Sequence, residues 1–147
     1  MICTFFGHRY VAESIQPVLR STLIDLIENK NTTLFYVGNH GGFDAMVYRV
    51  LRELAAIYPI SYYVVLAYMP QKRNPWDTTD YSVTLLPEGV ETVPRQFAII
   101  YRNKWMLRQA DYVVTYVTSH IGSGAAKFKT MGMKWGKTVI ELADTEE

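Results

Sequence analysis

Hydrophobic positions along the chain alternate between two spacings. Short apolar runs that end at or near glycine are typical of buried parallel strands, whereas apolar residues three and four positions apart are typical of helices. The runs predict strands at residues 2–6, 34–37, 61–67, 112–117 and 138–142, with a short strand at 83–86. The helical spacing predicts helices at 15–27, 43–58, 96–108 and 125–133, and Pro59 ends the second of these.

This alternation predicts an α/β fold, a three-layer sandwich in which helices cover both faces of a mostly parallel sheet. A chain of 147 residues is expected to form a single domain, residues 1–147. Right-handed crossovers place the C-terminal ends of parallel strands along one edge, which is where such sheets bind ligands. The polar stretch 69–81 is expected to be a loop that flanks this edge.

Composition and charge narrow the range of functions. Hydrophobic residues make up 49% of the chain and charged residues 20%, which is ordinary for a globular protein. The formal net charge of +1 argues against a strongly basic nucleic-acid-binding surface, although a local basic patch remains open. The single cysteine, Cys3, excludes an internal disulfide framework. No membrane span or signal peptide is recognisable, so a cytoplasmic protein without a membrane partner is expected.

Two glycine-containing turns follow predicted strands in the N-terminal half. Gly7-His8-Arg9 follows the first strand, and Arg9 can make a forked contact to phosphate or simply be solvated. Gly38-Asn39-His40-Gly41-Gly42-Phe43-Asp44 joins the second strand to the second helix. Its glycines would let a ligand approach the backbone, and Asp44 either contacts a ribose or base or only complements the helix dipole.

Two further segments lie in the C-terminal half. Gly122-Ser123-Gly124-Ala125 leads from a strand into a helix, where free backbone N–H groups suit a phosphate. It is not a Walker A loop, because no Gly-Lys-Ser/Thr follows. Arg102 and Asn103 lie in the preceding helix, where an arginine is most often solvated. If Arg102 only supplies charge, its replacement by alanine should weaken binding and leave the domain folded.

The spacing of histidine and cysteine residues does not indicate a metal or cofactor site. His8, His40 and His120 are far apart in sequence, and no Cys-x-x-Cys or His-Glu-x-x-His pattern occurs, so neither a metal nor a cofactor is expected. His8 could act as a general base, but a lone histidine is more often structural. Ser123 does not lie in a Gly-x-Ser-x-Gly elbow, which leaves a serine nucleophile unsupported.

Taken in order, five short motifs resemble the SLOG superfamily, and within it the small bacterial YpsA-like proteins. They are Phe6-Gly7-His8-Arg9, Gly41-Gly42-Phe43-Asp44, Arg102-Asn103-x-x-Met106, Ala110-Asp111 and Gly122-Ser123-Gly124-Ala125. The resemblance implies a Rossmann-like domain that binds nucleotides or nucleotide-derived ligands. Relatives include the LOG-type phosphoribohydrolases and the DNA-processing protein DprA.

The chain departs from the enzymatic branch of that superfamily. LOG enzymes carry Pro-Gly-Gly-x-Gly-Thr-x-x-Glu, and alignment through Gly122 and Gly124 puts Ala125 in place of Thr and Phe128 in place of Glu. The leading hypothesis is therefore a binding or sensor module for a nucleotide-derived small molecule. In it Gly122 to Ala125 hold phosphate, Arg9 and Arg102 supply charge, and Asn39 and Asp44 contact sugar or base.

Two rival functions stay open, and whether the chain is an enzyme is left undecided. The first rival is a nucleotide N-glycoside hydrolase, with His8, Asp44 or Glu88 assisting cleavage. The second is a nucleic-acid or protein interaction module built on the eleven tyrosines. An exposed Trp76 or Trp135 would mark the subunit interface of a homo-oligomer.

Overall fold

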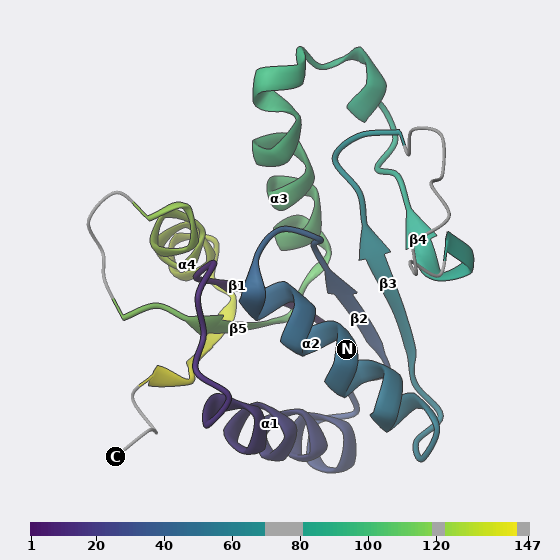
Figure 1. Ribbon diagram of the computed structural model, residues 1–147, viewed down its shortest axis with the longest axis vertical. Coiled ribbons are helices and arrows are strands. Elements are labelled where there is room, and N and C mark those ends of the chain that lie inside the picture. Colours follow the sequence, from purple (N-terminus) through teal and green to yellow (C-terminus); the bar gives the residue numbers. More distant parts are fainter. Residues whose placement is uncertain (70–80, 119–122, 144–147) are drawn as a thin grey trace.

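The computed structural model describes residues 1–69, 81–118 and 123–143. Within them the chain forms one six-stranded parallel sheet in the order β4-β3-β2-β1-β5-β6 (Figure 1). The strands are β1 (Ile2–Gly7), β2 (Leu34–Val37), β3 (Ser61–Val65), β4 (Thr84–Leu85), β5 (Tyr112–Tyr116) and β6 (Thr138–Glu141). The α-helices are α1 (Ile15–Asn29), α2 (Gly42–Ala55), α3 (Ala98–Gln109) and α4 (Gly124–Lys134).

Two hydrophobic clusters separate the sheet from its two helical layers. Apolar residues of α1 and α2 pack with those of β1, β2 and β3 in the larger cluster, and the two helices lie side by side in Figure 1. Residues of α3 and α4, among them Met106, Leu107 and Phe128, form the second cluster with side chains of β1, β3 and β5. The predicted α/β three-layer sandwich with a parallel sheet is therefore confirmed.

Element boundaries differ from the sequence prediction in a few places. α2 ends at Ala55, because the N–H groups of residues 56–58 turn back to the carbonyls of Glu53 and Leu54 before Pro59 is reached. β3 is shorter than expected, and the predicted fourth strand is reduced to two residues. α3 begins at Ala98, after a 3-10 turn at Arg95–Phe97. The predicted loop at 69–81 falls almost wholly outside the described residues.

At one point in the sheet, the chain leaves two neighbouring strands towards helices on opposite faces. β1 pairs with β5, and the chain leaves β1 towards α1 on one face but leaves β5 towards α4 on the other. Gly7 and Tyr116 are opposite one another at the ends of these strands. Crevices of this kind, outside the carboxyl ends of diverging strands, are where open α/β sheets bind ligands. The turns after β1 and β2 lie along this edge, and so do Thr118 and Ser123, the described residues on either side of the gap after β5.

The helices of the described residues were compared with the length and hydropathy of a membrane-spanning helix. None of their helices combines the length and apolar character needed to cross a bilayer.

Candidate functional site

The N-terminus of α2 is closed by the turn that follows β1. The Gly42 N–H donates to the Arg9 carbonyl at 2.6 Å, and the Phe43 N–H donates to the His8 carbonyl at 3.3 Å. A Cβ atom on Gly42 would lie 2.5 Å from the Arg9 oxygen, and one on Gly41, whose φ is +95°, would lie 2.9 Å from the Arg9 Cα. Both glycines are therefore required by the contact between the two turns, and the N–H groups of Gly42 and Phe43 are already used.

Gly7 is required by packing against the same helix. A Cβ atom at Gly7 would lie 2.2 Å from the Phe43 Cδ2 and would clash with the ring of this fully buried side chain. Because a buried ring has no room to retreat, only glycine lets α2 begin this close to the end of β1.

The N-terminus of α4 is open by contrast. The Ser123 Oγ caps the helix by accepting the Ala126 N–H at 3.2 Å. The N–H groups of Gly124 and Ala125 meet no acceptor from the described part of the chain, and the first turn carries no acidic residue. Such a helix end favours an anion. Gly122, the first residue of the predicted phosphate turn, lies outside the described residues.

Arg102 is buried rather than solvated, with an exposed fraction of 1%. Its Nε donates to the Asn103 Oδ1 at 2.7 Å, and its Nη1 donates to the Asn39 Oδ1 at 3.0 Å and the Val65 carbonyl at 2.8 Å. Its Nη2 lies 3.2 Å from the His40 Nδ1. One guanidinium thus joins α3 to the turn after β2 and to the last residue of β3. The expectation that Arg102→Ala leaves the domain unaffected is therefore replaced by an expected loss of stability.

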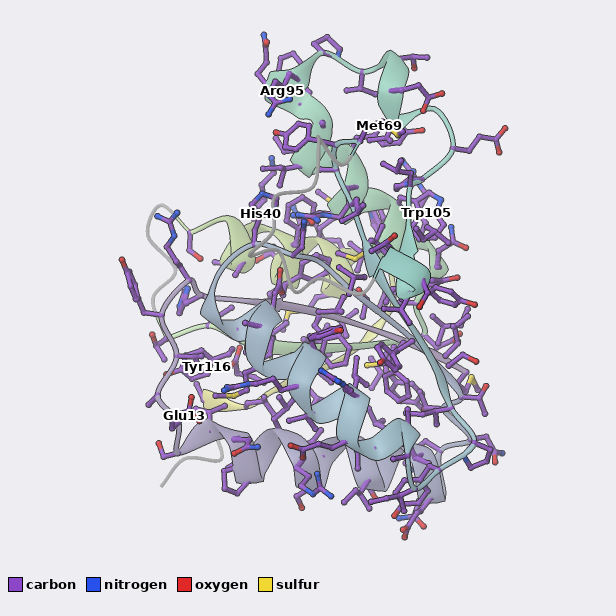
Figure 2. The ribbon with its side chains drawn as sticks, turned by 45° about the vertical axis from the view of Figure 1, so that its right-hand side comes forward. Glu13, His40, Met69, Arg95, Trp105 and Tyr116 are labelled. Atoms are coloured by element: carbon purple, nitrogen blue, oxygen red, sulfur yellow. The ribbon has the colours of Figure 1, made fainter. Side chains whose placement is uncertain are left out.

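The tautomer of His40 follows from its partner. Arginine only donates hydrogen bonds, so the His40 Nδ1 must accept and the ring proton must be on Nε2. Partial burial lowers the pKa of His40, and the charges of Arg102 and Arg9 lower it further. His40 is therefore held neutral, as the bond from Arg102 requires. Figure 2 shows His40 between the start of α2 and the part of the fold where Met69 and Arg95 lie.

Asp44 and Arg102 both lie against the position that a Cβ atom of Gly38 would occupy. A Cβ atom at Gly38 would be 2.9 Å from the Asp44 Oδ2 and 3.2 Å from the Arg102 Cζ. The same Oδ2 accepts the His40 N–H at 3.0 Å. Burial raises the pKa of Asp44 from 3.8 to about 6, against the opposing effects of that hydrogen bond and of the Arg102 charge. This carboxyl group is therefore half protonated at a pH of about 6, which is only slightly below neutral.

His8 links the end of β1 to residues on both sides of the gap that follows β5. Its Nε2 accepts the Thr118 N–H at 2.8 Å, so the proton of the neutral ring is on Nδ1, which lies 3.4 Å from the Ser123 Oγ. A nitrogen that carries a proton cannot take one from Ser123. The arrangement favours a structural role for His8 over that of a general base towards this serine.

These groups surround a cavity of about 120 Å³ at the edge of the sheet. Six of the predicted site residues line it: Gly7, Asp44, Arg102, Asn103, Gly124 and Ala125. Gly38, Asn39 and Gly41 line an adjoining cavity of about 240 Å³, which shares Asp44 with the first. His8, Arg9, Gly42 and Ser123 line neither of these two cavities, and hold the surrounding turns through the contacts described above.

Sequence reasoning missed some of the lining residues. The sequence predicts no binding role for His40, Phe5, Phe6, Ile99 or Met106, which also line the cavity. A signal was nevertheless present in α3, because Ile99, Arg102 and Met106 are three and four positions apart and so share one face of the helix. In the described residues, no three His, Cys, Asp or Glu side chains gather closely enough to hold a metal ion, and His120 is not among those residues.

Comparison with known proteins shows the fold. The crystal structure of DNA processing protein A (DprA) from Streptococcus pneumoniae matches with a TM-score of 0.69 and 15% sequence identity. The match covers 95% of this chain and 49% of the DprA chain, so this chain spans about half the length of that protein. No protein-family model and no curated protein matches the sequence. At this identity the likeness establishes a Rossmann-like α/β fold and nothing about activity.

Arg102→Ala should lower the free energy of unfolding by about 3 kcal/mol, because it empties a buried volume and leaves several hydrogen-bond acceptors unpaired. Arg102→Lys should recover less than half of that loss, since one ammonium group cannot reach all of the acceptors. Urea unfolding followed by circular dichroism measures both variants. Arg52→Ala, which removes an exposed arginine on α2, is the control and should change stability by less than about 0.5 kcal/mol. An equally small effect at Arg102 would contradict the structure.

Asp44 should make stability depend on pH in a definite direction. Its pKa is higher in the folded chain than the usual 3.8, so ionisation disfavours the folded state and stability falls as pH rises from about 4 to about 6. Asp44→Asn keeps an acceptor for the His40 N–H and removes the charge. The variant should be more stable than the parent by about 1–3 kcal/mol at pH 7.5 and equal to it near pH 4. A difference that does not vary with pH would refute the assignment.

Proposed function

We propose that this chain binds a phosphate-bearing, nucleotide-derived small molecule at the C-terminal edge of its sheet. The observation that carries the proposal is the cavity of about 120 Å³ that is lined by a buried arginine, Arg102, and by Gly124 and Ala125, whose N–H groups meet no acceptor within the described residues. Each of these features favours an anion independently, and they come from different elements of the fold.

The size of the cavity limits what it can hold. At about 120 Å³ it is below the roughly 300–1,000 Å³ that encloses a whole drug-sized ligand, so it suits one phosphate-sized group. The rest of the ligand would extend past Asp44 into the adjoining cavity of about 240 Å³ beside Gly38, Asn39 and Tyr48. There the Asn39 amide, whose oxygen is already held by Arg102, can offer its NH₂ group to a sugar or base.

One observation favours the rival hydrolase function. Asp44 lies where the two cavities meet, and its pKa of about 6 would let it act as a general acid near neutral pH. Glu88, the other carboxylate considered from the sequence, does not line either of these cavities. An N-glycoside hydrolase built on this site would therefore depend on Asp44.

The resemblance to SLOG proteins, and to their YpsA-like branch, belongs to this proposal. The five motifs implied a nucleotide-derived ligand, and the DprA-like fold is compatible with that superfamily. We propose the closer relation to the YpsA-like group on the five motifs alone.

Gly124→Ala separates binding from folding. A Cβ atom there meets no protein atom within 4 Å, and alanine is a better helix former than glycine, so the melting temperature of the free variant should not fall. The added methyl group would stand beside the bound phosphate. In a thermal-shift screen with nucleoside monophosphates, ADP-ribose and their cyclic relatives, the parent should be stabilised and the variant should lose most of that shift.

Gly132→Ala adds the same methyl group to α4 away from the cavity and should retain the full shift. The parent nucleosides, which lack phosphate, should stabilise the protein less than their monophosphates. The proposal fails if no ligand raises the melting temperature at millimolar concentration, or if Gly124→Ala responds as the parent does. Release of free base from a stabilising ligand, abolished by Asp44→Asn, would select the hydrolase.

A further inference from the structure

The cavity proposed to hold a phosphate group also carries a carboxyl group. Asp44 lines it together with Arg102, Gly124 and Ala125, and Asp44 is the only acidic side chain among the described residues that line this cavity or the adjoining one. An ionised carboxylate would repel the anion that the guanidinium and the open N–H groups attract, because like charges this close disfavour one another. The charge of Asp44 therefore decides whether the cavity accepts a phosphate.

The two carboxyl oxygens of Asp44 have different surroundings. Oδ2 accepts the His40 N–H at 3.0 Å, whereas Oδ1 accepts no hydrogen bond from the described residues. Within that part of the chain, the Thr32 Oγ1 is the only fully enclosed side-chain oxygen or nitrogen that lacks a partner, so the Asp44 Oδ1 is in contact with open space. Oδ1 is thus the oxygen that a ligand at this edge of the sheet can reach.

Arg102 lies close to this carboxyl group without pairing with it. The ion pairs among the described residues join other side chains, and none joins Arg102 to Asp44. Four of the five N–H groups of the guanidinium donate to the neutral partners described above, which leaves one N–H of Nη2 for a ligand. A phosphate in the cavity would therefore accept from Arg102, from the first turn of α4 and from any donor that Asp44 provides.

The charged and titratable groups around Asp44 come from several elements. Arg102 on α3 favours the ionised form of Asp44, and so does the hydrogen bond from the His40 N–H, but burial outweighs both and raises the pKa of Asp44 to about 6. Arg9 belongs to the turn that meets the start of α2, and Tyr48 lines the adjoining cavity. The β1 residues that line the cavity are uncharged, and the first turn of α4 has no acidic residue. An anion placed among these groups would raise the pKa of Asp44 further.

We infer that Asp44 determines specificity by binding the phosphate group as a carboxylic acid, with Oδ1 donating a hydrogen bond to a phosphate oxygen. This rests on the proposed function. No covalent bond to the ligand forms or breaks. Above pH 7 the free carboxyl group and the free phosphate monoester are both mainly deprotonated, so each binding event takes up one proton from the solvent. The proton turns a repelling group into a fourth kind of contact.

The inference predicts that binding depends on pH in a definite direction. Adenosine 5′-monophosphate is titrated by calorimetry between pH 7 and pH 8.5, where its phosphate is mainly a dianion. The Kd should rise close to tenfold per pH unit, because one proton is bound with each ligand. Titrations at pH 7.5 in two buffers of different ionisation enthalpy should show the uptake of close to one proton.

Variants at Asp44 assign the proton. Asp44→Asn keeps an oxygen for the His40 N–H and places an NH₂ donor where the protonated Oδ1 would be. It should bind equally well at pH 7 and pH 8.5, take up no proton, and bind at least about tenfold more tightly than the parent at pH 8.5. Asp44→Ala has no donor and should bind about tenfold more weakly than Asp44→Asn at every pH. Asp25→Asn, which removes an exposed carboxylate from α1, is the control and should keep the pH dependence of the parent.

The outcomes separate this inference from the proposed function. Binding by the parent that does not vary with pH and takes up no proton would overturn the inference and leave the proposed function intact. Proton uptake that persists in Asp44→Asn would assign the proton to another group, such as His8 or His40, and would also overturn it. So would weaker binding by Asp44→Asn than by the parent across the whole range. Absence of binding at both pH 5.5 and pH 7.5 would overturn the inference, and a thermal-shift screen without any response would overturn the proposed function as well.

Discussion

The guanidinium of Arg102 is a positive charge removed from water at the edge of the sheet, and the arrangement of the site depends on it. Its hydrogen-bond partners are two side-chain amides, one backbone carbonyl and one imidazole, all of them neutral. Burial lowers the pKa of Arg102, yet arginine stays protonated at any ordinary pH. The charge is therefore held in place by dipoles and only partly balanced by the half-buried Asp44, which leaves the cavity favourable to a further anion.

The same interaction explains the state of its neighbours. His40 must be neutral to accept from Arg102, and the positive charges around it help to keep it so. The turn after β2 is fixed by bonds to Asn39 and His40, and the end of β3 by the bond to Val65. Since these elements are far apart in sequence, a single side chain from α3 sets the geometry of one wall of the cavity.

Two helix N-termini lie at this edge, and local contacts decide between them as anion sites. At α2, carbonyl groups of His8 and Arg9 occupy the first N–H groups, and Asp44 brings a negative charge into the first turn. At α4, Ser123 caps one N–H, while those of Gly124 and Ala125 remain open within the described residues. Both ends follow glycine-containing turns, so the distinction arises from tertiary contacts and not from the turn sequences.

The sheet and its helices could be predicted from the sequence because hydrophobic spacing records burial directly. Runs such as residues 34–37 and the stripe of α2 are set by the need to cover both faces of a parallel sheet. Because the C-terminal ends of parallel strands lie along one edge of a sheet, the turns that follow them could also be placed there. The burial of Arg102 could not be predicted from residue type, although its position on the apolar face of α3 was a signal. The contacts of Gly41 and Gly42 with Arg9 depend on how two turns meet, and no local pattern encodes that.

The most direct test of the anion site is a ¹H–¹⁵N NMR titration of the protein with a nucleoside monophosphate. We expect the largest shifts at the amides of Gly124, Ala125 and Gly7 and at the Arg102 Nε, with little change at the occupied Gly42 N–H. Shifts confined to Gly42 and Phe43, or to residues far from the 120 Å³ cavity, would contradict it.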